Sequence, residues 1–169
     1  PVFAPDGRHR RADLAGGAML DLGIYPVSFA RFLLGEPVSV SAHGVLADTG
    51  VDATVGGVVS FESDRMAVFH TSLDMLTSGR ATVFGTLGRI DVGAPFWVAS
   101  DFTVRLVGEE PVHVEMPHQG LAHEAQHAMD RIRAGHLESD VIPLAVTMST
   151  MELLDEIRRQ VGVVYPEER

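Results

Sequence analysis

The sequence contains no cysteine, so disulfide bonds, thiolate nucleophiles and thiolate metal ligands are all excluded. Basic residues are also scarce: 13 Lys and Arg stand against 23 Asp and Glu, which gives a formal net charge of −10. Binding to nucleic acid or to an anionic membrane needs clustered cationic side chains, so neither is expected as a partner. The lack of cysteine suits a cytoplasmic protein.

Long hydrophobic runs are absent as well. No run approaches about eighteen consecutive apolar residues, and the N-terminus lacks a charged-then-apolar signal pattern, so we expect neither a membrane-spanning helix nor export. The 169 residues are still 46% hydrophobic, which is enough for a substantial core. No internal repeat, low-complexity tract or linker suggests a second domain, so residues 1–169 are expected to form a single domain.

A helical pattern occupies residues 16–35, GGAMLDLGIYPVSFARFLLG. Pro26 has no N–H to donate and its ring crowds the preceding turn, so one smooth helix is not expected. We predict a short helical turn ending near residues 22–23 and a new helix from about Tyr25, which ends at Gly35. The expected apolar face of this helix consists of Phe29, Phe32 and Leu33.

The same stretch carries an acid, Asp21, and a phenol, Tyr25, four residues apart. A helix N-terminus at Tyr25 would favour the phenolate, which is the direction of tuning that a proton-transferring tyrosine needs. The pair is also compatible with a structural role, in which Asp21 caps the second helix and Tyr25 is an ordinary half-buried aromatic residue.

A series of strands follows, with no helix between them, because apolar and polar residues alternate between turn residues. The expected strands are residues 38–43, 54–61, 66–73, 80–84, 89–92, 102–107 and 112–116. The Gly56-Gly57 pair predicts either a β-bulge or a close approach of another part of the backbone.

Two helices are expected to close the chain, over residues 121–134 and 143–161, because each pattern ends at a glycine. An apolar stripe on the second helix is interpreted as core: Leu144, Met148, Met151, Leu154 and Ile157. Helix, strands and helices in this order predict an α+β domain, with a single, largely antiparallel sheet and helices on one face. The open face is expected to be an interface.

Residues 16–26, GGAMLDLGIYP, resemble the signature that opens the C-terminal domain of the Gfo/Idh/MocA oxidoreductase superfamily, named after glucose-fructose oxidoreductase and inositol dehydrogenase. That signature is a Gly cluster, Leu-Asp, Gly and then His or Tyr. The Tyr-Pro pair resembles the branch that contains the dimeric dihydrodiol dehydrogenases. GTLGRIDV at residues 85–92, Glu-Ala at 124–125 and the segment from Pro143 occur in the expected order. The resemblance covers nearly the whole chain and implies a glyceraldehyde-3-phosphate dehydrogenase-like C-terminal fold.

The resemblance implies that Tyr25 is the general acid/base and that Asp21 supports it. It also implies a small-molecule substrate (a sugar, polyol or trans-dihydrodiol), and a homodimer or higher homo-oligomer formed through the open sheet face. Full-length members bind NAD or NADP in an N-terminal Rossmann domain with a Glu-Lys-Pro lysine. This sequence has neither a GxGxxG turn in a βαβ unit nor a Lys in that context. We therefore expect a substrate-binding and oligomerisation domain that binds no cofactor alone and is inactive without its Rossmann domain.

Three further residues are candidates for substrate binding. Arg8, in the basic cluster at residues 8–11, is placed near the cofactor or the domain junction by the resemblance. His70 shares a strand face with Val68, so it is a candidate pocket residue beside Tyr25, and Trp97 is a candidate pocket wall. Each also has an ordinary structural interpretation: a solvated basic cluster, a hydrogen-bonded sheet residue and a plug at a sheet edge.

Residues 123–127, HEAQH, match the H-E-x-x-H zinc motif on an expected helix, so a zinc hydrolase is an alternative function. A third ligand is hard to place because His136 lies beyond the glycine that ends the helix. No metal site is therefore predicted, although His118, His123 and His127 are candidates for an adventitious surface metal. The remaining alternative is a stand-alone, non-enzymatic domain that dimerises and binds a ligand.

Overall fold

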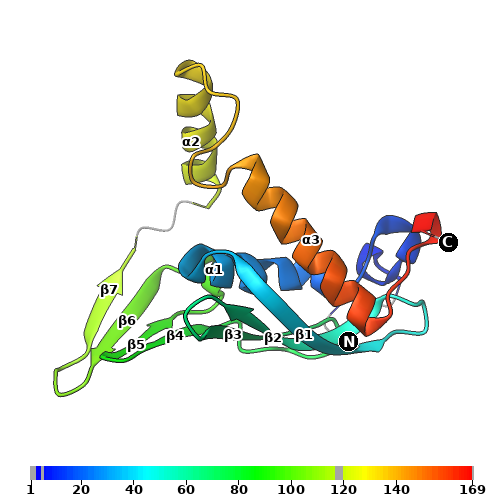
Figure 1. The fold of residues 1–169 in the computed structure, drawn as a ribbon, viewed down its shortest axis with the longest axis horizontal. Helices are drawn as coiled ribbons and strands as arrows, with labels where there is room; N and C mark the ends of the chain where they lie inside the picture. Colours follow the sequence, from blue (N-terminus) through cyan, green and yellow to red (C-terminus); the bar gives the residue numbers. More distant parts are fainter. Residues whose placement is uncertain (1–2, 5, 117–119, 169) are drawn as a thin grey trace. The chain divides into compact units, whose positions relative to one another are not determined.

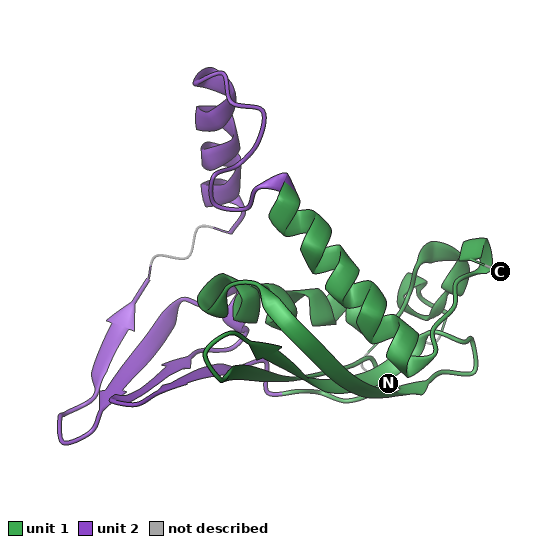
Figure 2. Ribbon diagram, in the orientation of Figure 1, with its two compact units in different colours: residues 1–77, 145–169 green, residues 78–144 purple. Residues whose placement is uncertain are grey.

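The computed structural model describes residues 3–4, 6–116 and 120–168 (Figure 1). The expected single domain comprises two compact units, residues 1–77 with 145–169 and residues 78–144 (Figure 2). The α+β class and the antiparallel strand pairing are confirmed, but the strands form two sheets, of three and four strands, instead of one. The sheets separate because residues 73–80 form no strand and include Gly79 at φ +60°, outside the extended region.

The first unit contains strands β1 (Pro37–Leu46), β2 (Asp52–Phe61) and β3 (Arg65–Ser72), in the order β1-β2-β3. The pairing register runs through Gly56 and Gly57 without a shift, so the bulge alternative is wrong there. The close-approach alternative is correct for Gly57, since a Cβ would lie 2.7 Å from the Phe69 ring and 2.9 Å from the Ser41 carbonyl oxygen.

The helical stretch before β1 is continuous. A π-helix, η3 (Met19–Gly23), leads directly into α1 (Ile24–Leu34), so the expected interruption before Pro26 is wrong. The change from π to α occurs near the predicted boundary, because the wider π-turn accommodates the proline that follows it. Gly35, at φ +88°, ends α1 as predicted.

Helices α1 and α3 (Leu144–Val161) lie on the same side of the three-stranded sheet (Figure 1). Their buried side chains form one core with inward-facing strand residues: Met19, Val27, Ala30, Ala42, Val55, Val59, Phe61, Phe69, Leu153, Leu154 and Ile157. By length and composition alone the stretch Ala12–Leu34 is a candidate membrane span, but core helices pass the same test, and Met19, Val27 and Ala30 are buried in this core.

The apolar face expected for α1 is wrong in part. Phe32 is 72% exposed, whereas Arg31 is buried. The Arg31 guanidinium donates to the Val146 carbonyl and to Thr150 Oγ1 on α3, and it pairs with Glu36. The side of α1 that carries Arg31 is therefore buried against α3 through polar contacts. The stripe on α3 is core at Leu154 and Ile157 only, since Leu144, Met148 and Met151 are exposed.

The second unit contains strands β4 (Ala81–Gly85), β5 (Gly88–Val92), β6 (Asp101–Leu106) and β7 (Val112–Glu115), followed by α2 (Ala122–Arg133). All seven strands and both closing helices are thus present near their predicted positions. One face of this sheet carries Val83, Ile90 and Val104, which are register partners. None of the residues of α2 is buried.

Candidate functional site

Two glycines position the helical stretch that carries the acid and the phenol. A Cβ on Gly16 would lie 2.7 Å from the carbonyl oxygens of Arg8 and His9. Gly17 has φ +129° and its N–H donates to the His9 carbonyl, 2.8 Å away. The absence of a side chain at Gly16 therefore lets residues 8–11 pack against the start of η3, and the backbone conformation of Gly17 directs its N–H to His9.

The packing of residues 8–11 brings two side chains onto Asp21. Arg8 donates from a terminal guanidinium nitrogen to Asp21 Oδ1 at 2.5 Å, and His9 Nε2 lies 3.2 Å from Asp21 Oδ2. Both carboxylate oxygens of Asp21 are therefore engaged by basic side chains. The Asp21 side chain remains 21% exposed, so this cluster is partly open to solvent.

His9 belongs to this cluster but was not among the residues predicted from the sequence. Its ring packs against Phe3, with ring centroids 4.3 Å apart. The sequence shows only a short basic run at residues 8–11, for which a solvated surface is the usual interpretation. The proximity of this run to Asp21 depends on the fold, and no spacing rule of the sequence links residues 9 and 21.

Tyr25 lies one residue into α1 and four residues after Asp21, and it is 40% exposed. The expectation that it stands at a helix N-terminus is wrong, because η3 precedes α1 without a break. The favourable effect of a helix dipole therefore does not apply to its phenol. What the geometry offers is a partly exposed tyrosine on the same helical stretch as a carboxylate held by Arg8 and His9.

The structure does not bring His70 to this cluster. Its neighbours in β3, Phe69 and Thr71, are buried, and Thr71 faces Gly23 of η3, so His70 points to the opposite face of the sheet. The expected pocket position beside Tyr25 is therefore wrong, because strand residues alternate between faces. Trp97 belongs to the second unit, in the short helix Phe96–Val98, where its ring meets that of Phe96 edge-on at 5.2 Å.

The described residues lack the strand arrangement of a Rossmann-type dinucleotide site. Every strand pair in residues 3–4, 6–116 and 120–168 is antiparallel. A Rossmann-type site needs parallel strands joined by a helix whose N-terminus receives the pyrophosphate. The residues described here therefore form no Rossmann-type site for NAD or NADP.

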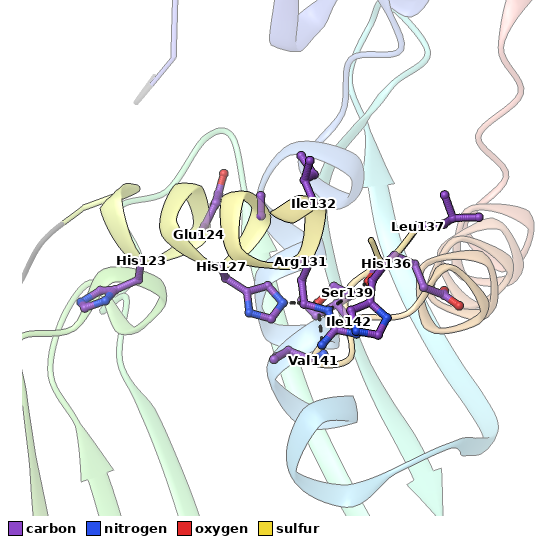
Figure 3. Close-up of a pocket in the computed structure, with 12 residues that line it drawn as sticks. His123, Glu124, His127, Arg131, Ile132, His136, Leu137, Ser139, Val141 and Ile142 are labelled. Carbon is purple, nitrogen blue, oxygen red and sulfur yellow. Dashed lines mark hydrogen bonds between the residues drawn. The ribbon is translucent and has the colours of Figure 1, made fainter. Parts of the chain in front are cut away.

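A pocket of about 660 Å³ lies beside α2, within the second unit (Figure 3). His123, Glu124 and His127 of the HEAQH motif contribute to its lining, as expected from their place on a helix. No group of three or more His, Asp or Glu side chains in the described part of the chain is arranged to hold a metal ion. His118 lies outside the described residues.

The His127 side chain contacts the loop that follows α2. Its Nε2 lies 2.9 Å from Ser139 Oγ (Figure 3) and 3.5 Å from Asp140 Oδ1. A Ser-His-Asp triad needs serine and acid on opposite ring nitrogens, and here both contact the same one. Ser139 Oγ also accepts hydrogen bonds from the backbone N–H groups of Val141 and Ile142. The side chains of His127, Ser139 and Asp140 therefore stabilise the loop that follows α2.

Solved structures share this fold. An aldose-aldose oxidoreductase from Caulobacter crescentus matches with a TM-score of 0.80 at 21% identity, over 95% of this chain and 50% of that chain. A 3-ketoreductase from Actinomadura kijaniata matches with a TM-score of 0.81 at 18% identity, over 95% of this chain and 51% of that chain. The fold is thus that of a domain found in oxidoreductases.

Sequence comparison defines the family. The model of the GFO/IDH/MocA C-terminal domain matches residues 1–91, and the chain belongs to this family, as its motifs predicted. The trans-1,2-dihydrobenzene-1,2-diol dehydrogenase of Homo sapiens is 32% identical over 169 aligned residues, which cover 92% of this chain and 49% of that protein. The chain therefore spans about half the length of the curated relatives it matches.

Proposed function

We propose that this chain is the substrate-binding and oligomerisation half of an NAD(P)-dependent oxidoreductase. The observation that carries the proposal is the cluster on the η3–α1 stretch, where Arg8 and His9 hold the Asp21 carboxylate four residues before the exposed Tyr25. In the complete enzyme Tyr25 exchanges a proton with a hydroxyl or carbonyl group of the substrate, and Asp21 orients Tyr25 or the substrate. The redox equivalent is carried by NAD or NADP, bound by the Rossmann domain of the complete enzyme.

The names of the relatives support the proposed substrate class. The Homo sapiens relative is named as a dehydrogenase of a cyclic trans-diol, and the two solved structures are named as an aldose-aldose oxidoreductase and a 3-ketoreductase. All three names describe reactions in which a carbon of the substrate interconverts between alcohol and carbonyl. A sugar, polyol or trans-dihydrodiol is therefore the proposed substrate. The absence of cysteine supports a cytoplasmic location for the enzyme.

The sheet face opposite the helices supports the oligomerisation role. Val68 is 75% exposed, Met66 65% and Val45 64%, and all three alternate with inward-facing residues on β3 or β1. Exposed apolar side chains gathered on one sheet face are typical of a protein interface. We assign this face to a homodimer or higher homo-oligomer.

The decisive experiment is to read the coding sequence upstream of Pro1 and to express the complete product. The proposal expects a Rossmann domain with a Glu-Lys-Pro lysine, and NAD- or NADP-dependent oxidation of diols or sugars. A product that lacks such a domain would leave this chain without hydride chemistry. The non-enzymatic, ligand-binding alternative would then replace the proposal.

A further inference from the structure

Asp52, the first residue of β2, is completely buried although it is an acid. Its Oδ2 accepts a hydrogen bond from the backbone N–H of Met19, 2.6 Å away, at the start of η3. The N–H groups in the first turn of a helix have no partner within the helix, and a carboxylate is a favourable acceptor for them. A side chain from a strand thus performs the function of a helix cap.

Gly17 makes room for this carboxylate. A Cβ on Gly17 would lie 2.1 Å from Asp52 Oδ1, and its backbone has φ +129°. Any other residue at this position would displace the carboxylate and strain the backbone. Asp52 Oδ1 has no hydrogen-bond partner among the described residues, so the carboxylate is anchored by Oδ2 alone.

Tyr165, near the other end of the sequence, contacts Gly16, the residue before Gly17. Its hydroxyl donates to the carbonyl oxygen of Gly16 at 2.7 Å, and the ring is 6% exposed. The guanidinium carbon of Arg158 lies 4.7 Å from the centre of that ring. Arg158 in turn pairs with Glu168 at 3.0 Å. Residues 16–19 are therefore fixed from two sides.

We propose that Asp52 is a positioning residue for Asp21 and Tyr25, because its carboxylate fixes the first turn of the helical stretch on which both lie. Met19 is two residues before Asp21, so a shift of the first turn moves the Asp21 carboxylate relative to Arg8 and His9. Tyr165 has the same role at Gly16, one step earlier in the chain. The catalytic meaning of this positioning rests on the proposed function, but the geometry does not.

The protonation of Asp52 supports this role. Burial raises the pKa of Asp52 to about 6, and the hydrogen bond from the Met19 N–H partly offsets that rise. Arg158 from α3 lowers this pKa, and the other titratable group that faces Asp52 is the Tyr165 phenol. At neutral pH the carboxylate is ionised and accepts its hydrogen bond strongly. An acid that is costly to bury is compatible with a role in function instead of stability.

The test is an NMR measurement on this chain that compares the wild type with Asp52→Asn. We expect the variant to shift the backbone amide signals of Asp21 and Tyr25 and to speed amide exchange in residues 22–25 roughly fivefold, the effect of a weakened cap. In the wild type the amide signal of Met19, whose N–H donates to Asp52, should titrate with a midpoint of about 6, and in the variant it should not.

Two further variants complete the experiment. Tyr165→Phe removes only the hydroxyl, should produce a smaller change of the same kind, and decides the question if Asp52→Asn does not fold. Thr54→Val is the matched control, because Thr54 lies on the same strand as Asp52 and the change removes its hydrogen bond to Ser72 Oγ of β3. It should leave the signals of Asp21 and Tyr25 unchanged.

The proposal is wrong if the loss of the Asp52 charge or of the Tyr165 hydroxyl alters only the signals of residues 16–19. In the complete enzyme, Asp52→Asn should lower kcat several-fold while the KM for the dinucleotide stays the same. A wild-type enzyme without dehydrogenase activity would contradict the proposed function alone. The NMR result would still decide whether Asp52 positions Asp21 and Tyr25.

Discussion

Asp21 Oδ2 lies 3.2 Å from His9 Nε2, although the two residues are twelve positions apart in the sequence, and the exposed Tyr25 follows Asp21 by four residues. Arg8 occupies the other oxygen of the same carboxylate. Asp21 is thereby fixed by two side chains from a segment that makes no strand and only short helical turns. The orientation of the acid depends on the anchoring of that segment as much as on the helix that carries it.

Replacement of His9 should therefore impair the complete enzyme without unfolding it. His9→Ala leaves Arg8 as the only basic partner of Asp21, and we expect turnover to fall roughly threefold to tenfold, the range of one lost hydrogen bond. Steady-state kinetics measure this effect. His136→Ala, at an exposed position in the second unit, is the control and should have normal turnover. Equal kinetics for both variants would mean that His9 does not orient the acid.

Tyr25→Phe removes the hydroxyl proposed to transfer the proton. In the complete enzyme, turnover should fall roughly 10²-fold or more, the usual contribution of a general acid or base, while dinucleotide affinity is retained. Dinucleotide titration and turnover, measured on the same preparation, separate the two effects. Unchanged turnover would end the assignment of Tyr25 as the acid/base.

The folded and unfolded states of this chain should bind protons differently at Asp52. Its pKa is about 6 in the folded chain against 3.8 for the ordinary residue. Between these values the folded state holds more protons, so the free energy of unfolding should fall as pH rises from about 4 to 6, by up to about 3 kcal/mol from this group. Urea unfolding at several pH values tests this. In Asp52→Asn that part of the slope should vanish, and an unchanged slope would contradict the assignment.

Arg31 should stabilise the first unit mainly by filling space between α1 and α3. Arg31→Ala removes the contacts with Val146 and Thr150 and leaves a cavity, so we expect a loss of about 2–4 kcal/mol in the free energy of unfolding. Arg31→Met keeps most of the volume and should cost much less, because a buried charge can often be replaced by an apolar side chain of similar size. Urea denaturation compares the two, and equal losses would show that the charge dominates.

The open face of β1–β3 should control oligomerisation. Val68→Lys places a charge among exposed apolar side chains and should shift the protein from dimer to monomer in analytical ultracentrifugation. Leu76→Lys, at an 89% exposed position outside the strands, is the matched control and should not change the oligomeric state. A wild-type chain that is monomeric at all concentrations would refute the dimer through this face.

The strands were predictable because alternation of apolar and polar residues follows directly from the geometry of a sheet. The π-turn before Pro26 was not, since the sequence shows a missing N–H but not how the preceding turn adapts to it. The separation into two sheets depends on residues 73–80, whose composition is that of any connection. For the same reason no pattern marks Asp52, which lies before the strand predicted at residues 54–61, although the fold buries it under η3.

The candidate site was predictable for Asp21 and Tyr25, which lie on one helical stretch, and for Arg8, which the resemblance to the family marks. Asp21 and Tyr25 follow from their spacing and from the resemblance to the family. His9 and Asp52 reach the site from other segments, and single-sequence patterns do not record contacts over such separations. The failure for His70 has a simpler cause, because alternation along a strand assigns residues to two faces but does not say which face the helices cover.

The hydrogen bond between Tyr165 and Gly16 spans 149 positions of the sequence. On the ribosome, Gly16 emerges long before Tyr165 is synthesised, so the segment that leads into η3 remains unclamped during most of translation. Because long-range contacts form slowly, the site at Asp21 and Tyr25 reaches its final geometry late, after the strands and α3 are in place. A nascent chain stalled before residue 165 would therefore carry an assembled sheet and an unfinished site.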